Sequence, residues 1–187
     1  SRTHSTQILP LNVGTDERYF LPHAVNFMIR YRMAHLEELI KELATQETRI
    51  TFSRFTPELG VEIGLALYEA ARDQGAPVAI DVYAFEHVLF HLALPGATPD
   101  NDRWIERKRA VALRFHKSSF RVGRELEAAG KTIDERYYVD PHLFSAHGGS
   151  FPLTLAGGGV IGAATVSGLP QEDDHALVVS ILERFAQ

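Results

Sequence analysis

The order of helical and strand-like segments predicts an α+β domain in which helices pack on a five-stranded antiparallel sheet. Residues 77–84 and 87–93 are adjacent apolar, β-branched runs, and residues 151–155 and 159–166 form a second such pair. The link inside each pair is too short for a crossover helix, so each pair predicts a hairpin. A fifth short run lies at residues 49–53. The full order, α-β-α-β-β-α-β-β-α, is typical of helices layered on an antiparallel sheet.

The helical segments show a 3.6-residue period and recognisable ends. Thr56 is suited to cap one helix, with Pro57 in its first position, and Gly75 ends it. Ser118 and Ser119 predict a bend between two later helices. The sequence therefore predicts helices over about residues 34–48, 57–74, 103–117, 119–129 and 171–185, with caps for the third offered by Asp100, Asn101 and Asp102 and a stop for the fourth at Gly130.

The first 32 residues differ from the rest of the chain. Pro10, Gly14 and Pro22 interrupt any period, and the apolar side chains are scattered. We expect residues 1–32 to form an extended arm that is either disordered or docked on a partner. Met33 precedes the first helical pattern, so residues 33–187 are expected to form a single domain.

Composition excludes several kinds of site and partner. The chain has 187 residues, 45% of them hydrophobic and 23% charged, as in a soluble globular protein. Its formal net charge of -5 disfavours nucleic acid as a partner. Without cysteine it has no disulfide, zinc-thiolate site or iron–sulfur cluster. No apolar run approaches the roughly 20 residues that span a membrane. No secretory signal pattern is present, so we expect a cytoplasmic protein without membrane contact.

Two glycine-rich motifs lack the context that their best-known chemistry requires. Gly157-x-Gly159-x-x-Gly162 matches the dinucleotide-binding string, but a strand rather than a helix follows it, so a hairpin turn is the better interpretation. His147-Gly148-Gly149 is similar to an oxyanion loop, yet no G-x-S-x-G nucleophile motif exists in the chain. A glycine pair before a strand predicts a backbone bend or a close approach to a ligand.

Two further features carry polar chemistry. His175 follows Asp174 at the start of the last helix, where a carboxylate could fix its tautomer; it could be a base, an axial ligand or a packing residue. Residues 103–124 hold eight Lys and Arg residues against one acid, Glu106, a local charge of +7. This stretch is either a solvated or intersubunit face, or an anion site for carboxylate or phosphate. His87 and His91 lie too far apart on a strand to chelate one metal, and no metal site is expected.

Two stretches of the chain resemble the UPF0303 proteins. They read LPGATPDNDRWIERKRAVALRFHKSS and GGSFPLTLAGGGVIGAATVSGLPQEDDH. That group is similar to GlcG/HbpS-like proteins, labelled haem-degrading, and to the C-terminal domain of PduO-type proteins. The resemblance implies a profilin-like, three-layer α/β/α domain with a five-stranded antiparallel sheet, and a homo-oligomer. Some relatives bind haem; because C-x-x-C-H is absent here, any haem would be non-covalent.

Three hypotheses of function follow. The first is a small-ligand-binding module for haem or another carboxylated ligand, with His147, His116 or His175 as the axial ligand if haem binds. The second is a structural or adaptor protein that forms a symmetric oligomer without a cofactor. The third is an enzyme that uses His175 with Asp174. For the first, the expected ligand-binding residues are Arg107, Lys108, His116, Ser118, Ser119, His147, Gly148, Gly149, Phe151, Asp174 and His175.

Overall fold

The computed structural model describes residues 17–186 and divides the chain into two compact units, one ending at His35 and one beginning at Leu36. One helix, α1 (Glu17–Arg49), contributes residues to both. The expected extended arm is therefore wrong for residues 17–32, which are helical, and residues 1–16 lie outside the described part of the chain. No proline interrupts residues 23–33, so the predicted helix can extend toward the N-terminus there, and α1 continues through Pro22 to Glu17.

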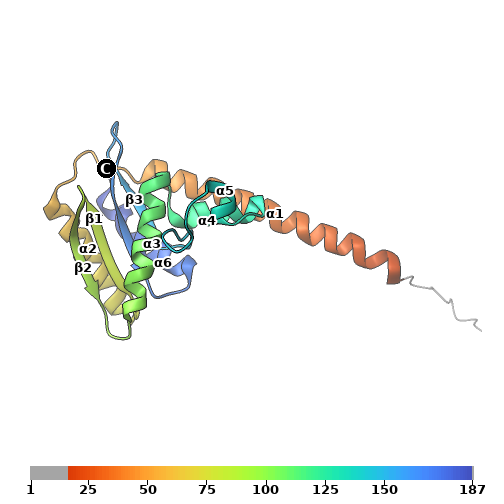
Figure 1. Cartoon of the computed structure of the whole chain (residues 1–187), viewed down its shortest axis with the longest axis horizontal. Helices are drawn as coiled ribbons and strands as arrows, with labels where there is room; N and C mark the ends of the chain where they lie inside the picture. Colours follow the sequence, from red (N-terminus) through yellow and green to blue (C-terminus); the bar gives the residue numbers. More distant parts are fainter. Residues whose placement is uncertain (1–16, 187) are drawn as a thin grey trace, which may run out of the picture. The chain divides into compact units, whose positions relative to one another are not determined.

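The second unit holds the expected alternation of helices and strands (Figure 1). Its sheet has the strand order β2-β1-β4-β3, and every neighbouring pair is antiparallel. None of the helices in the described residues is long and apolar enough to cross a membrane. The elements after α1 are α2 (Pro57–Asp73), β1 (Ala79–Ala84), β2 (His87–Ala93), α3 (Pro99–Phe115), α4 (Ser119–Ala129), α5 (Ile133–Tyr137), β3 (Ser150–Thr154), β4 (Val160–Ser167) and α6 (Gln171–Phe185).

The α+β prediction with an antiparallel sheet is confirmed, but the described residues form four strands rather than five. The run at residues 49–53 contributes a single parallel bridge between Phe52 and Leu155. Helix α1 continues to Arg49, into the predicted run, and between there and Pro57 at the start of α2 the chain pairs with β3 and its turn only at this bridge. Phe52 is nevertheless 1% exposed and belongs to the main core.

The predicted helix ends are mostly observed. Thr56 Oγ1 accepts a hydrogen bond from the Leu59 amide at 3.2 Å, and Ser118 Oγ accepts one from the Arg121 amide at 3.2 Å. The third helix begins earlier than predicted, at Pro99. The Asn101 side chain stabilises the N-terminus of this helix, because its Oδ1 accepts a hydrogen bond from the Thr98 amide at 2.7 Å.

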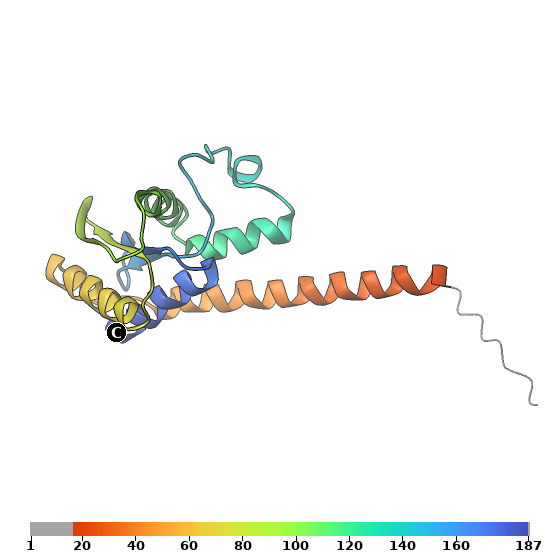
Figure 2. The ribbon, with the colours of Figure 1, turned by 90° about the horizontal axis from the view of Figure 1, so that it is seen from below.

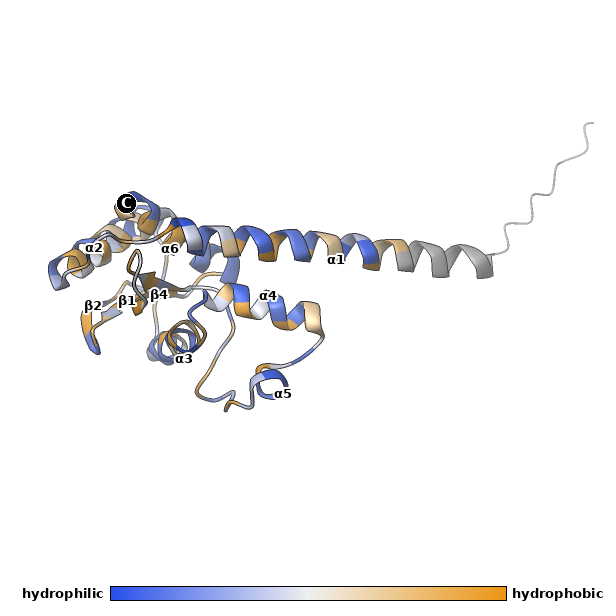
Figure 3. Ribbon diagram, turned by 90° about the horizontal axis from the view of Figure 1, so that it is seen from above, coloured by the Kyte–Doolittle hydropathy of each residue, from blue (hydrophilic) through white to orange (hydrophobic). Residues whose placement is uncertain are grey.

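Helices cover both faces of the sheet. Figures 2 and 3 show α3 on one side of the strands and α2 with α6 on the other. Because successive strand residues point to opposite faces, the two faces carry different side chains. The apolar face, toward α2 and α6, consists of Ile80, Val82, Phe151, Leu153, Ala164 and Val166. The polar face, toward α3 and α4, includes Asp81, Tyr83, Ser150 and Thr165.

The glycine string at residues 157–162 forms the predicted hairpin between β3 and β4. Gly157 has a φ of +70°, as the turn requires. A Cβ at Gly162 would lie 1.9 Å from the Tyr83 carbonyl oxygen on the neighbouring strand. The string therefore serves strand packing and the turn, without the helix N-terminus that would bind a pyrophosphate.

Candidate functional site

A buried ion pair joins α3 to the start of α6 on the polar side of the sheet. Lys108 Nζ lies 2.9 Å from Asp174 Oδ2 and also donates to the Val166 carbonyl oxygen at 3.2 Å. Lys108 is 3% exposed and Asp174 is 1% exposed. The third Lys108 N–H has no acceptor among the described residues, since an ammonium carries three donors.

Asp174 also stabilises the turn that follows β4. Its carboxylate accepts hydrogen bonds from the amides of Gly168 at 3.3 Å and Leu169 at 3.0 Å. Burial raises the pKa of Asp174, and the neighbouring ammonium and amides only partly offset that rise. Burial likewise lowers the pKa of Lys108, and Asp174 opposes the change. Both pKa values are thus moved toward the neutral forms of the pair.

The glycine pair next to this ion pair packs against protein rather than leaving room for a ligand. A Cβ at Gly148 would lie 2.1 Å from the Gln171 carbonyl oxygen. Gly149 has a φ of +127°, and a Cβ there would lie 2.3 Å from the Val166 carbonyl oxygen and 2.9 Å from Lys108 Nζ. The predicted close backbone approach is therefore present, and it allows Lys108 to reach Asp174.

His147 lies beside the pair on the loop before β3. Its Nδ1 is 2.8 Å from Ser145 Oγ, and its ring meets the Trp104 ring edge-on at a centroid distance of 5.2 Å. The Arg107 guanidinium stacks over Trp104 at 4.7 Å. Burial, and then the positive charges of Lys108, Arg107 and Arg124, lower the pKa of His147. At neutral pH the imidazole is therefore uncharged within a positive field.

Two adjoining cavities, the His147 cavities, meet at this histidine. The polar cavity, about 290 Å³, is lined by Trp104, Lys108, Gln171 and Asp174 among others. The cationic cavity, about 330 Å³, lies between α3, α4 and the loop before β3. His147 and Gln171 line both. The cationic cavity is bounded by the charged residues Arg107, Arg124, Glu127 and Lys131 and by apolar side chains that include Leu126, Ile133 and Phe144.

The remaining predicted site residues lie outside these cavities. Ser119 Oγ accepts from the Ser150 amide at 3.0 Å, so the serine bend joins α4 to β3. Phe151 is fully buried on the apolar face, and Ser118 caps α4. His116 is exposed and ends α3 with a φ of 53°. Of the predicted set, the structure brings together Arg107, Lys108, His147 and Asp174 around the cavities, with Gly148 and Gly149 packed behind them.

His175 does not use its neighbour Asp174 as a partner. Its Nε2 lies 2.9 Å from Gln46 Oε1, and its ring lies between Phe120 and Phe151, at centroid distances of 5.0 and 6.1 Å. The buried Nδ1 has no hydrogen-bond partner. Burial lowers the pKa of His175 to about 4. This arrangement gives His175 a packing role and gives no support to a catalytic His175–Asp174 pair.

Much of the basic stretch is neutralised by acids, some of them nearby in sequence and others far away, and Arg124 of the cationic cavity pairs with Glu127 at 3.0 Å. Arg109 pairs with Asp81 at 2.7 Å, and Lys117 pairs with Glu125 at 2.8 Å. Arg121 contacts Glu47 of α1. Sequence reasoning missed Asp81, although a charged residue inside an apolar strand signals a buried partner. Trp104 and Arg124 lie in stretches that the sequence analysis considered but were not among the predicted ligand-binding residues, and Ser145 and Gln171, which belong to no local site motif, were not among them either.

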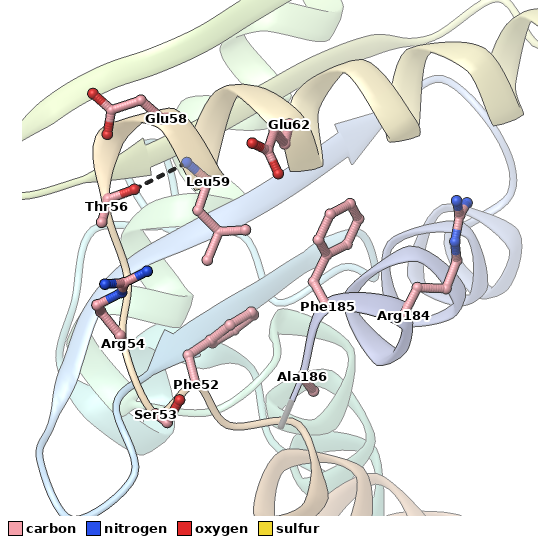
Figure 4. A pocket seen from close by; sticks show the side chains of 10 residues that line it. All are labelled: Phe52, Ser53, Arg54, Thr56, Glu58, Leu59, Glu62, Arg184, Phe185 and Ala186. Carbon is pink, nitrogen blue, oxygen red and sulfur yellow. Dashed lines mark hydrogen bonds between the residues drawn. The ribbon is translucent and has the colours of Figure 1, made fainter.

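A cavity larger than either His147 cavity lies elsewhere, at the N-terminus of α2 and the C-terminus of α6 (Figure 4). Its volume is about 640 Å³. Phe52, Leu59 and Phe185 form its apolar part, with Arg54 and Arg184 at its edges (Figure 4). It contains none of the predicted site residues. Within the described residues, no cluster of three or more acidic or histidine side chains is arranged to hold a metal ion.

Known proteins resemble this chain over most of its length. UPF0303 protein SCO2848 of Streptomyces coelicolor is 53% identical over 146 residues, covering 78% of this chain and 92% of that protein. A UPF0303 protein of Serratia proteamaculans is 42% identical, covering 81% and 94%. The crystal structure of Ybr137w protein matches with a TM-score of 0.73 and 36% identity, covering 79% and 87%.

More distant structures share the fold. The crystal structure of HbpS matches with a TM-score of 0.58 and 24% identity, covering 72% of this chain and 92% of that one. A PduOC:heme complex matches with a TM-score of 0.57 and 16% identity, covering 71% and 94%. A family model described as haem degrading protein HbpS-like matches residues 55–183. The chain therefore belongs to the HbpS-like family and, within it, to the UPF0303 proteins.

Proposed function

We propose that this protein is a small-ligand-binding module and that the His147 cavities take a ligand with a carboxylate on an apolar body. The observation that carries the proposal is an uncharged His147 held in a positive field. Burial, and then the positive charges of Lys108, Arg107 and Arg124, lower the pKa of this histidine. An anion entering the same space is attracted by those charges, and Arg offers a planar pair of donors to a carboxylate.

The walls of the cationic cavity fit the rest of such a ligand. Leu126, Ile133 and Phe144 supply apolar surface beside Arg107 and Arg124. Each of these arginines also has a buried Nε without a hydrogen-bond partner. Ligand sites commonly combine an apolar wall with a few polar anchors. The side chains of this cavity thus favour an amphiphilic acid over a purely polar metabolite.

The relatives suggest haem as the ligand. The family is described as haem degrading, and one structural neighbour is a complex with haem. The residues present fit it. His147 is uncharged, and Ser145 engages its Nδ1 while its Nε2 stays available. Arg107 and Arg124 suit the propionates, and the apolar wall suits the macrocycle. When bound, haem would supply iron-centred redox chemistry.

Titration with hemin tests this proposal. We expect the wild-type protein to shift the Soret band at stoichiometric hemin, and His147→Ala to lose most of that shift. Arg107→Gln with Arg124→Gln should weaken hemin binding by about tenfold or more, since hydrogen bonds to charged groups contribute about 1.5–3 kcal/mol each. His116→Ala, which removes an exposed histidine away from the cavities, is the matched control. A wild-type spectrum that hemin leaves unchanged would refute haem as the ligand.

A second candidate, a homo-oligomer with a structural or adaptor role, is favoured by strand β2. It is an edge strand with one unpaired side in the described sheet, and it contains neither lysine nor proline. Val88 on this strand is 53% exposed. Such an edge is a template for pairing with a second copy. Light scattering of wild type and Val88→Lys would decide: a monomer in both cases contradicts this candidate.

A further inference from the structure

The amine of Lys108 combines burial, an adjacent carboxylate and a position in the wall of a cavity. Asp174 lies 2.9 Å away, and both residues line the polar cavity of about 290 Å³. Other lysines lack this combination: Lys41 is 72% exposed and Lys117 is 33% exposed. A structural ion pair needs only the two charges, whereas this pair also lies at a space that a small molecule can enter.

We propose that Lys108 forms a reversible imine with a small 2-oxo acid bound where the two His147 cavities meet. The inference rests on the proposed function, because it assumes that a carboxylated ligand enters the His147 cavities. A 2-oxo acid supplies both parts that these cavities recognise: a carboxylate for Arg107 and Arg124 of the cationic cavity, and a carbonyl for the amine in the polar cavity. The carboxylate is expected on the cationic side, because the other charged residues that line the polar cavity are Asp100 and Asp174. Desolvated lysines beside a suitable partner are the ones that react with carbonyl groups.

The chemical step balances without an oxidant or a reductant. Asp174 takes one proton from the Lys108 ammonium, which frees the lone pair on Nζ. Nζ adds to the carbonyl carbon, and one proton moves from this nitrogen to the carbonyl oxygen to give a carbinolamine. Asp174 then returns its proton to the hydroxyl group, the C–O bond breaks, water leaves, and a C=N bond forms. The net change is ammonium plus carbonyl to protonated imine plus water.

The surroundings favour this product. The protonated imine keeps a positive charge opposite Asp174, so the buried carboxylate remains paired after the reaction. Burial lowers the pKa of Lys108, which favours the free amine, and Asp174 opposes this change. His147, uncharged at neutral pH, lines the same cavity and is available to accept a proton.

Reductive trapping tests the inference. The full-length protein is incubated with pyruvate and sodium borohydride, digested, and analysed by mass spectrometry for the N-(1-carboxyethyl) group. We expect Lys108 to be modified about tenfold faster than Lys131 or Lys41, as a pKa-lowered amine should be. Lys108→Arg, which keeps the positive charge beside Asp174, should remove this adduct, and Lys131→Arg should leave it unchanged. Absence of trapping, or equal labelling of all lysines, overturns the inference.

Lactate separates this inference from the proposed function, because it carries the carboxylate without the carbonyl. Equilibrium binding of lactate and pyruvate is measured by calorimetry on the same protein. If both bind with equal affinity and no adduct forms, the imine is refuted while the carboxylate site stands. If neither binds, hemin leaves the spectrum unchanged and no adduct forms, both proposals fail. An adduct confined to Lys108 together with tighter binding of pyruvate than of lactate supports both.

Discussion

The two faces of the sheet reach full burial by different means. The apolar face packs Phe151, Leu153 and Val166 against α2 and α6, and its contacts need no particular partner. The polar face places Asp81 at 1% exposure opposite Arg109 of α3, where one ion pair must be formed with the correct geometry. The His147 cavities lie on this side, whereas the larger cavity lined by Phe52, Leu59 and Phe185 lies beside α2 and α6. The comparison indicates that one face stabilises the domain while the other provides sites.

The largest effect is expected on the apolar face. Phe151→Ala should destabilise the protein by about 3–5 kcal/mol, because it removes a fully buried ring and leaves a cavity. Chemical denaturation of wild type and variant measures the difference. Phe85→Ala is the matched control, since Phe85 is 43% exposed and should cost far less. Equal losses in the two variants would contradict the assigned core.

On the polar face, breaking one ion pair should be costly while replacing the whole pair should not. Lys108→Met leaves Asp174 buried without its counter-charge, so we expect a loss of about 3–5 kcal/mol. Lys108→Met with Asp174→Leu removes both charges and should recover part of that loss. Recovery should be incomplete, since Asp174 also holds the Gly168 and Leu169 amides. Thermal and urea unfolding of the three proteins provide the comparison.

The free energy of unfolding should depend on pH through His175, whose buried ring contacts Phe120 and Phe151. Burial lowers its pKa from 6.5 to about 4, so the unfolded chain takes up the proton first as the pH falls. Stability contributed by the neutral ring is full above about pH 6.5 and is lost as the pH falls toward 4. The loss amounts to about 3 kcal/mol over that window. Urea unfolding between pH 7 and 4 should show a flatter pH dependence in His175→Gln than in wild type.

The smallest effect is expected where α3 faces solvent. Arg103 and Glu106 form a hydrogen-bonded pair at 2.9 Å, with side chains 73% and 52% exposed. Arg103→Ala should change stability by less than about 0.5 kcal/mol, because exposed pairs contribute little. Arg109→Met, further along the same helix, should be clearly more destabilising, since the buried Asp81 then loses its guanidinium partner and keeps only the contact with His91. Similar values for both variants would remove the distinction between exposed and buried charges on α3.

Much of the fold was predictable because its signals are local. The hairpin at residues 85–86 forms without an Asn-Gly pair, with Phe85 and Glu86 at φ of 54° and 64°. The alternating runs on either side of this turn were sufficient to predict it. The prediction of a fifth strand at residues 49–53 was wrong because strand pairing there depends on nonlocal contacts. Whether Phe52 pairs with more than one residue depends on where α1 ends and how β3 lies beside it.

The site was predicted only in part, because its members meet through tertiary contacts. Arg107, Lys108, His147 and Asp174 were recognised from a basic run, a glycine pair and an acidic helix start. The same signals also suggested Ser118, Ser119 and Phe151, whose side chains serve a cap, a strand contact and the core. A residue type and its neighbours in sequence do not tell which face of a sheet it occupies.

The sequence by itself determined most of the elements, their order and the two antiparallel hairpins, since periodicity, caps and short links act within a few residues. It also determined that α3 is basic. Only the tertiary structure decided which of those charges are neutralised, because Asp81, Glu47 and Asp174 reach α3 and α4 from distant parts of the chain. The free energy of a charge depends on burial and on its partner, and both are properties of the folded chain.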